Sequence, residues 1–439
     1  MDPGNIKGAE ARQPGRLEAA PSPGAGRAAL LLVLIAIGLS LTTSIMAVLL
    51  EPIRTEFGLS DGSLGMLANL GFGAGLLAAS LPGGIAADHL NRRNILSACL
   101  VIAGLATAFG GLGGIAGIVI MRIVAGSFHG PNSPAITSLF SDLFPAHKRA
   151  SIMGLYFGAQ ALGTLLDFLG GGYLAIQLGW RATLMIFGLA SVVIGLALPF
   201  LLKEPARERA ASPAAEKPPT TRFAFAFLWS QRSAVYVICF SVFAVATLSS
   251  TLTWLVSFFV RIHQVPLAQS GSLVALAIAC GVVGTFVGGI LTDRMARRDA
   301  RWGIGVSAVL LVVATIANVA MVFAPSIYLA VGLMMLWALG IHAHLGPAWG
   351  ILQGLVPPRM RGRASSVLAG LSTLVGFGLG PAVTGLLSQA MTPLFGGETI
   401  RYAMAVTNLI NLVAIAFCLL AIRQLPAALA RIEALGSEM

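Results

Sequence analysis

Long apolar runs separated by short polar segments dominate the sequence from residue 28 onward. A helix needs about 20 apolar residues to cross a hydrocarbon core of roughly 30 Å, and twelve runs in the chain are long enough. The predicted spans are 28–50, 64–87, 95–113, 115–140, 150–174, 182–202, 234–259, 270–292, 303–323, 327–352, 364–389 and 402–422. The pattern therefore predicts an all-α membrane protein with twelve transmembrane helices.

Polar segments divide the spans into two sets of six. Residues 1–27 are rich in Pro, Gly and Ala, which predicts a disordered cytoplasmic tail. Residues 203–232 contain four prolines and much of the basic charge. This segment is predicted to be a cytoplasmic linker between an N-terminal six-helix bundle, 28–202, and a C-terminal one, 233–423. Residues 424–439 are predicted to form a second cytoplasmic tail.

Basic residues gather on one side of the predicted membrane. With both ends of the chain on the same side, 23 of the 28 lysines and arginines fall in the tails and loops of that side. The loops of the opposite side hold Arg54, Arg181, Arg261 and Arg401. Cytoplasmic loops carry an excess of Lys and Arg, so both termini of this multi-pass cell-membrane protein are predicted to be cytoplasmic.

The composition agrees with a membrane location. The chain is 56% hydrophobic and only 10% charged, with a mean hydropathy of +0.86, whereas soluble proteins carry roughly 25% charged residues. The net charge of +11 is distributed as a membrane topology requires, so no nucleic-acid partner is expected. All four cysteines lie in apolar runs, so no disulfide framework is predicted.

A short basic motif occurs once in each predicted bundle. Residues 84–93 read GIAADHLNRR and residues 289–298 read GILTDRMARR, each between two spans. Residues 40–44 of the first span also match residues 247–251 of the seventh. Internal repeats indicate the architecture directly. Two homologous halves place a substrate site between them, near the middle of the membrane.

The repeated G-x-x-x-D-x-x-x-R-R motif resembles the signature loop of the major facilitator superfamily of secondary transporters. Residues 355–366, LVPPRMRGRASS, with GFGLGP at 376–381, resemble the Spinster branch of that superfamily, as does the stretch 122–156. The resemblance implies two pseudo-symmetric six-helix bundles that rock about a site lined by spans 1, 4, 7 and 10. It also implies lipid transport, because the studied animal members carry lysophospholipids or sphingosine-type lipids.

Two charged residues lie deep inside predicted spans. Arg122 lies in span 4, where an arginine costs about 2.5–3.5 kcal/mol on insertion scales, so a partner or a function is expected. Asp167 is a carboxylate well inside span 5. Both residues are similarly far from the turn near Pro145, so antiparallel helices would place them at one depth as an ion pair. The alternative is an unpaired Asp167 that burial keeps protonated.

Three of the six histidines lie near the middle of equivalent spans. His129 follows Arg122 by seven residues on one helical face, and His342 is its repeat equivalent, with His344 nearby. An imidazole titrates near neutrality, so these side chains are candidates for carrying a proton or binding a phosphate. The alternative is a neutral histidine bonded to a carbonyl or hydroxyl group. No thiolate or carboxylate cluster accompanies them, so no metal site is predicted.

The chain departs from the resembled family at the positions implied to carry a proton. Family members have an Asp-Arg pair in span 1 where this chain has Thr42 and Thr43, and a glutamate where it has His129. The remaining groups able to titrate near neutrality at mid-depth are the histidines and a perturbed Asp167, and His129 is the best placed of them to carry the coupling proton. Anion affinity is then expected to rise as the pH falls through the histidine range near 6.5, and His129→Gln is expected to flatten that dependence.

Acidic residues end spans 2 and 8 at the repeated motif. Asp88 and Asp293 lie at helix C-termini, where an acid is unfavourable without a nearby cation or helix N-terminus. In the resembled family the first-half acid latches the two halves together on the cytoplasmic side, and Arg92 or Arg93 is also within reach of Asp142. Solvated loop charge is the alternative. The predicted gating residues are Asp88, Arg92, Arg93, Asp142, Asp293 and Arg297.

These patterns predict a secondary active transporter that works by alternating access on an amphipathic organic anion or a lysolipid-like molecule. A proton is the candidate coupling ion, membrane lipids are the expected surroundings, and the chain is expected to act as a monomer. The alternatives are a drug or small organic-acid transporter and a non-transporting membrane sensor. No phosphate-binding Gly-Lys loop or nucleophile–base pattern is present, so neither enzyme activity nor a cofactor is expected. The predicted substrate and coupling residues are Arg122, His129, Asp167, His342, Thr42, Thr43 and Trp254, where Trp254 is either a cavity-lining or a helix-packing aromatic.

Overall fold

The computed structural model describes residues 25–144, 146–202, 221–357 and 360–437, and all regular secondary structure in these ranges is helical. The predicted N-terminal tail and most of the predicted linker lie outside the described residues. We call 25–202 the first half of the chain and 221–437 the second half.

Each half is a bundle of long helices joined by short turns. The first half contains α1 (Ala25–Ser40), α2 (Ile45–Phe57), α3 (Asp61–Gly65), the π-helical turn η1 (Met66–Leu70), α4 (Gly71–His89), α5 (Arg92–Gly110), η2 (Gly111–Gly113), α6 (Gly114–His129), α7 (Asn132–Leu143) and α8 (Ala146–Leu201). The second half contains α9 (Thr221–Ser230), α10 (Arg232–Ile262), α11 (Leu267–Ala296), α12 (Trp302–Val322), α13 (Ile327–His342), α14 (Leu345–Gly354), α15 (Arg361–Leu371), the π-helical turn η4 (Ser372–Leu379), α16 (Gly380–Phe395), η5 (Gly396–Glu398), α17 (Thr399–Asn408) and α18 (Ile410–Ser437).

Each of the twelve predicted spans is helical over most of its length. Within the described residues, nine helical stretches are long and apolar enough to cross a membrane. Three of them, Arg92–Ile136, Ile152–Leu201 and Arg361–Arg431, each contain two of the predicted spans. The count falls from twelve to nine because the chain stays nearly helical through the turns between those spans.

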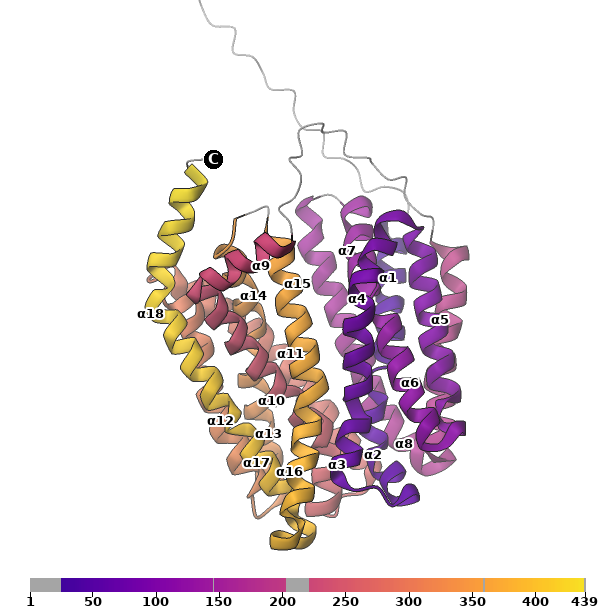
Figure 1. Cartoon of the computed structure of the whole chain (residues 1–439). Helices are drawn as coiled ribbons and strands as arrows, with labels where there is room; N and C mark the ends of the chain where they lie inside the picture. The colour runs from indigo at the N-terminus through magenta and orange to yellow at the C-terminus, as the bar shows by residue number, and fades with distance from the viewer. Residues whose placement is uncertain (1–24, 145, 203–220, 358–359, 438–439) are drawn as a thin grey trace, which may run out of the picture.

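The two halves lie side by side, with their helices running between two opposite faces (Figure 1). The tail face carries α9 and the C-terminal end of α18, and the opposite face carries α3 and the η5 turn (Figure 1). We call the second one the closed face, because α3 of the first half packs there against α16 of the second. Large apolar side chains such as Phe200 and Tyr328 point outward, 86% and 88% exposed, as expected for a surface that faces lipid.

Three predicted spans are interrupted near their middle. Span 1 breaks between α1 and α2, span 4 between α6 and α7, and span 10 between α13 and α14. In span 4 the break coincides with Pro131, which has no backbone N–H to continue a helix. Span 7 is instead one continuous helix, α10, of 31 residues.

Hydroxyl groups explain the break in span 1. The side chains of Thr42 and Thr43 both donate to the carbonyl oxygen of Leu39, at 3.0 and 2.9 Å. Backbone N–H groups of Thr43 and Ser44 turn back to the carbonyl oxygen of Ser40. Threonine hydroxyls compete in this way with the regular backbone hydrogen bonds of a helix, so the polar residues that mark span 1 also interrupt it.

The region between predicted spans 5 and 6 is more helical than the sequence predicts. The sequence predicts a loop at 175–181, whereas α8 runs helically through this region. Only Gly179 departs from helical geometry, with φ of 83°. Glycine adopts a positive φ without a steric penalty, so a single residue is enough to turn the chain back.

Candidate functional site

Arg122 lies at the centre of a polar site in the first half. Its side chain, on α6, is 1% exposed. One terminal nitrogen donates to the side-chain oxygen of Asn69 at 2.6 Å and the other to the carbonyl oxygen of Thr43 at 3.2 Å. The guanidinium lies over the ring of Phe72, 4.7 Å from its centroid, and Nε has no hydrogen-bond partner among the described residues. Every hydrogen-bond partner described for this buried cation is neutral.

Asn69 connects this site to the second half of the chain. It lies in the π-helical turn η1, a distortion that is often found at functional sites. While its oxygen accepts from Arg122, its nitrogen donates to the hydroxyl of Thr253 on α10 at 3.1 Å. One side chain therefore links Arg122 to the second half through two hydrogen bonds.

The predicted direct ion pair between Arg122 and Asp167 is wrong. No salt bridge within 4.0 Å joins these two described residues, and Asp167 is completely buried. Neither of its carboxylate oxygens has a hydrogen-bond partner in the described part of the chain. The backbone N–H of Ser44, in the break of span 1, donates to the carbonyl oxygen of Ser40 and not to this carboxylate. Asp167 lies on a part of α8 that packs on span 1, because an added Cβ at Gly163 would come within 2.6 Å of Ser40 and one at Gly171 within 2.5 Å of Ile45.

His129 is bonded at both ring nitrogens. Nδ1 lies 2.9 Å from the carbonyl oxygen of Ala125, one turn earlier in α6. Nε2 lies 3.0 Å from the carbonyl oxygen of Leu39 and 2.9 Å from the hydroxyl of Thr43. The Thr43 hydroxyl has a single hydrogen, so it donates either to Leu39 or to Nε2, and Nε2 is itself the donor when it carries a proton. The site residues His129, Thr43 and Arg122 are thus brought together, with Thr43 between the other two.

His342 repeats this arrangement in the second half. It is the last residue of α13, as His129 is the last residue of α6, and its Nδ1 lies 2.9 Å from the carbonyl oxygen of Ala338. The ring fits against Gly281 of α11, where an added Cβ would come within 2.6 Å of it. His344 is buried beside the ring of Phe240. The structure does not bring His342 to Arg122 by any described contact.

The other predicted site residues have packing contacts. Thr42 is buried and bonded only to Leu39 among the described residues. Trp254 is fully buried, and its Nε1 donates to the carbonyl oxygen of Pro381 at 2.9 Å. Its ring also limits the space at Gly65 of the first half. Trp254 therefore occupies a helix-packing position near the closed face.

The predicted gating residues lie toward the tail face, and the structure describes them in part. The side chains of Asp88 and Asp142 lie outside the described residues, so their gating roles stay predictions. Arg92 is buried and donates to Ser138 at 2.9 Å, whereas Arg93 donates to backbone carbonyls at the end of α8. In the second half, Asp293 and Arg297 are both exposed.

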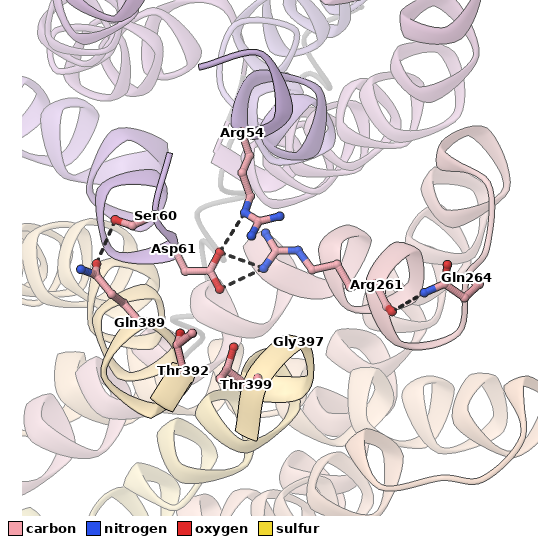
Figure 2. Close-up of a pocket in the computed structure, with 10 residues that line it drawn as sticks. Arg54, Ser60, Asp61, Arg261, Gln264, Gln389, Thr392, Gly397 and Thr399 are labelled. Carbon is pink, nitrogen blue, oxygen red and sulfur yellow. Dashed lines mark hydrogen bonds and ion pairs between the residues drawn. The ribbon is translucent and has the colours of Figure 1, made fainter. Parts of the chain in front are cut away.

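A cluster of charges joins the two halves at the closed face (Figure 2). Arg261, at the end of α10, donates to both carboxylate oxygens of Asp61 at 2.8 and 2.9 Å. Its Nε donates to Glu51 at 2.7 Å, and Arg54 approaches Asp61 to 3.4 Å. Glu51, Arg54 and Asp61 belong to the first half and Arg261 to the second, so one arginine bridges the halves.

Polar contacts extend this cluster. Ser388 of α16 donates to Asp61 at 2.6 Å, and Ser60 donates to Gln389 at 2.9 Å. A pocket of about 540 Å³ lies here, and its lining includes Arg54, Ser60, Asp61, Arg261, Gln264 and Gln389 (Figure 2). Nearby, burial and the positive charge of Arg401 lower the pKa of His263, which favours its neutral form. The closed face is thus sealed by hydrogen-bonded charges from both halves.

Sequence reasoning missed Asn69 and the bridge made by Arg261. Asn69 was detectable, because it is an amide inside the apolar run of span 2. Glu51, Asp61 and Arg261 looked like ordinary loop charges, since they lie at the ends of spans. Their pairing crosses 200 residues or more of sequence, so no local pattern indicates it.

Comparisons with known proteins agree with this architecture. The profile of the Major Facilitator Superfamily matches residues 30–377. The chain is 29% identical over 367 residues to an MFS-type efflux pump of Mycolicibacterium smegmatis, covering 82% of this chain and 83% of that one. It is 25% identical over 378 residues to the hexuronate transporter of Bacillus subtilis, covering 83% and 88%.

The fold is also that of a solved structure, a bacterial homologue of the human lysosomal transporter Spinster in an inward-facing and unoccupied conformation. The TM-score is 0.84 at 24% sequence identity, over 93% of this chain and 98% of the other. Because the superfamily profile covers most of the sequence and the helices superpose on that transporter, this chain belongs to the major facilitator superfamily, a family of multi-pass membrane transporters and not of enzymes.

Proposed function

We propose that this transporter carries small organic anions by alternating access, with Arg122 as the binding site for the acidic group. The observation that carries the proposal is the bonding of Arg122. A guanidinium that is 1% exposed has only neutral hydrogen-bond partners among the described residues, and its Nε has none. A buried charge without a counter-charge is costly, and an anionic substrate would supply the missing charge.

The surroundings of Arg122 favour an anion with an apolar body. Phe72 covers one side of the guanidinium, so a carboxylate or phosphate head would lie beside an aromatic ring. The Bacillus subtilis relative is named as a hexuronate transporter, and a hexuronate is a carboxylate. A lysolipid-like substrate, with a phosphate head and a longer tail, is the extension that the resemblance of residues 355–366 to the Spinster branch suggests.

We further propose that the tail face is cytoplasmic and that the structure represents the state closed toward the outside. Most basic residues belong to loops on the side of the tail face, and such loops remain in the cytoplasm. The bridge from Arg261 to Asp61 and Glu51 holds the opposite face shut. Transport then requires this bridge to open while the cytoplasmic side closes.

The substrate class is tested by ligand-induced thermal stabilisation of the purified protein. Galacturonate, 4-hydroxybenzoate and lysophosphatidate are the anionic probes, and ethidium is the cationic one. Stabilisation by at least one anion is expected in the wild type and is lost in Arg122→Gln, because the amide carries no charge. Arg301→Gln, an exposed arginine in the loop before α12, is the matched control.

The alternatives give different results in the same assay. Binding of ethidium alone, unchanged in Arg122→Gln, would show a drug transporter and refute the anion proposal. Counterflow of the bound probe in proteoliposomes separates transport from sensing, because a sensor binds without moving its ligand. A folded protein that binds an anion but shows no counterflow would overturn the transport proposal.

A second candidate function is efflux. The Mycolicibacterium smegmatis relative is named as an efflux pump. Direction is decided by which side of the membrane the substrate is taken from, so loading the probe inside or outside oriented vesicles distinguishes export from uptake.

A further inference from the structure

We propose that the pocket at the closed face is a second binding site, which takes a small hydroxylated carboxylate from the outside and stabilises the conformation in which this face is shut. The site is separate from Arg122 and does not depend on the substrate that Arg122 takes. Its effect on transport rests on the proposed function, because it requires alternating access and a cytoplasmic tail face.

The pocket lies between the two halves of the chain. Arg54, Ser60 and Asp61 line it from the first half, and the end of α10, α16 and η5 line it from the second (Figure 2). Its volume of about 540 Å³ falls within the range of small-molecule sites, roughly 300–1,000 Å³. Because its walls belong to different halves, the pocket is complete only while the closed face is shut.

The lining of the pocket is polar throughout. None of the ten residues described around it has a hydrophobic side chain. Gln264 and Gln389 supply amide groups, and Ser60, Thr392 and Thr399 supply hydroxyl groups. Amides and hydroxyls both donate and accept hydrogen bonds, so they match the hydroxyl groups of a sugar acid. An aromatic acid or a lipid tail would find no apolar surface here.

The charged groups of the lining favour an anion. Asp61 is the one acid among the lining residues, and its carboxylate already accepts from Arg261 at 2.8 and 2.9 Å and from Ser388 at 2.6 Å. Arg54 donates no hydrogen bond among the described residues, and its Nε approaches Asp61 to 3.4 Å as an ion pair alone. A guanidinium carries several N–H donors. Arg54 therefore has unused donors for a carboxylate, whereas Asp61 has little left to offer a cation.

Other acids near the pocket have arginine partners of their own. Glu51 accepts from Arg261 at 2.7 Å and does not line the pocket. Glu398, in the turn before α17, pairs with Arg401 at 3.2 Å. These acids are therefore paired with arginines other than Arg54, which leaves the Arg54 guanidinium as the group that can exchange its contact for a ligand.

The backbone at Gln264 is strained at the pocket wall. Gln264 follows α10 with φ of 53°, and it is the one non-glycine residue with a positive φ among those described. Such a conformation is uncommon for a residue with a side chain, and strain of this kind gathers at ligand sites. The Gln264 Nε2 donates to the carbonyl oxygen of Arg261 at 2.7 Å. Glycine would adopt this φ without strain, so the amide side chain is present here despite a conformational cost.

A ligand that contacts both halves acts on the conformation. In the proposed complex the carboxylate binds Arg54 of the first half, and the hydroxyl groups of the ligand bond to the amides and hydroxyls of the second half. These contacts are complete only while the closed face is shut, so binding shifts the population toward that conformation. A ligand supplied from the outside therefore slows the opening that transport requires.

Binding is tested in the Arg122→Gln variant, which removes the charge of the central site. Gluconate is the probe, and sorbitol is the matched molecule that has the hydroxyl groups but no carboxylate. Arg54 is 41% exposed, so water competes for it, and an affinity in about the millimolar range is expected, weaker than at the buried Arg122. Titration followed by saturation-transfer NMR should show binding of gluconate and not of sorbitol. Adding Arg54→Gln should reduce the gluconate affinity about tenfold, because a charged hydrogen-bond donor is lost.

Two further variants make the binding test specific. Arg181→Gln removes an arginine that pairs with Glu56 and does not line the pocket, so gluconate affinity should not change. Gln264→Gly suits the local backbone and removes the amide, so it should weaken binding several-fold without lowering the melting temperature. Absence of gluconate binding, equal binding of sorbitol, or equal affinities in Arg54→Gln and Arg181→Gln would overturn the proposal.

The effect on conformation is measured without transport. Glu51→Gln weakens the contact with Arg261 outside the pocket, so more molecules should open at the closed face. Spin labels at the exposed positions Thr55 and Leu394 report this opening. In the Arg122→Gln background, gluconate is expected to restore the shorter distance and sorbitol is not. Unchanged distances at saturating gluconate would refute the proposed effect on conformation.

Counterflow connects the pocket to transport. With 4-hydroxybenzoate as the transported probe, gluconate added outside right-side-out proteoliposomes is expected to slow counterflow in the wild type and not in Arg54→Gln. Gluconate loaded inside is expected to have no such effect. Equal slowing in the wild type and Arg54→Gln would show competition at Arg122 and overturn the role of the pocket. If no counterflow occurs at all, the proposed function fails, and the binding and distance measurements still decide whether the pocket is a site.

Discussion

The neutral partners of Arg122 make it possible to change its charge balance with one substitution. Asn69 places an amide oxygen 2.6 Å from the guanidinium and, through its nitrogen, reaches Thr253 in the second half. It occupies the position that a counter-ion would occupy. We expect the Asn69 amide to stay hydrogen-bonded to Arg122 until the acidic group of a substrate replaces it.

Asn69→Asp is therefore expected to act in two directions. The new carboxylate would pair with Arg122, so the melting temperature of the ligand-free protein should rise. The same carboxylate would exclude an anionic substrate, so affinity for the anion that stabilises the wild type should fall by about tenfold or more, since hydrogen bonds between charged groups contribute about 1.5–3 kcal/mol. Thermal unfolding with and without the probe measures both effects.

Asn69→Ala separates charge from the lost contact with Thr253. It removes the link between the halves but adds no carboxylate, so anion binding should persist. If Asn69→Asp bound the anion as tightly as the wild type, Arg122 would not be the site of the acidic group.

At the scale of helices, the matching polar segments 40–44 and 247–251 adopt different structures. Residues 40–44 break span 1, where the threonine hydroxyls turn back on Leu39. Residues 247–251 remain within α10, and two of their hydroxyls contact amide side chains of other helices. Thr247 is 2.6 Å from Asn411, and Thr251 accepts from Asn408 at 3.0 Å. A similar sequence is thus broken in one half, where a neighbouring helix supplies His129 to Thr43, and continuous in the other, where neighbouring helices supply Asn408 and Asn411.

The break in span 1 is expected to depend on Thr43. Thr43→Val keeps the shape of the side chain but removes the hydroxyl that contacts both Leu39 and His129. The backbone at 41–44 should then become more helical, and the alignment of the Thr43 carbonyl with Arg122 should be lost. Slower hydrogen exchange at 41–45 and a counterflow rate reduced several-fold are the expected results.

Thr42→Val is the matched control, because Thr42 contacts only Leu39 among the described residues. It should reduce counterflow less than Thr43→Val. Equal effects of the two substitutions would show that the break depends on the general polarity of the segment rather than on the contact between Thr43 and His129.

At the scale of the whole molecule, one arginine holds the closed face together. Arg261 bridges to Asp61 and Glu51 of the other half, and all three side chains are 7–12% exposed. Breaking a buried ion pair from one side costs about 3–5 kcal/mol. Because this pair spans the two halves, the cost falls on the closed conformation and not on the folding of either bundle.

Arg261→Gln is therefore expected to shift the protein toward a conformation open at the closed face. Spin labels at the exposed positions Thr55 and Leu394, one in each half, would report a longer distance in a larger fraction of molecules. Arg54→Gln is the control, since Arg54 is 41% exposed and only approaches Asp61, and it should change the distribution little. An unchanged distribution in Arg261→Gln would mean that apolar packing alone keeps this face shut.

From the sequence by itself, hydropathy and charge determined the membrane class and the helical segments, and the repeated loop motif indicated the superfamily. The physical reason is that a bilayer has a fixed thickness, so it constrains the length and composition of every helix that crosses it. The same constraint predicted that Arg122 and Asp167 lie inside spans, and both side chains are buried in the structure.

Tertiary structure alone decided which groups those residues contact. The position of a residue along a helix determines its depth in the membrane. The direction in which its side chain points depends on how neighbouring helices pack. Gly163 and Gly171 let the part of α8 that carries Asp167 pack on span 1, and η1 brings Asn69 to Arg122. Arg261 meets Glu51 across 210 residues of sequence. Such contacts follow from the packing of the two halves, because nothing in the local chain specifies a partner so far away.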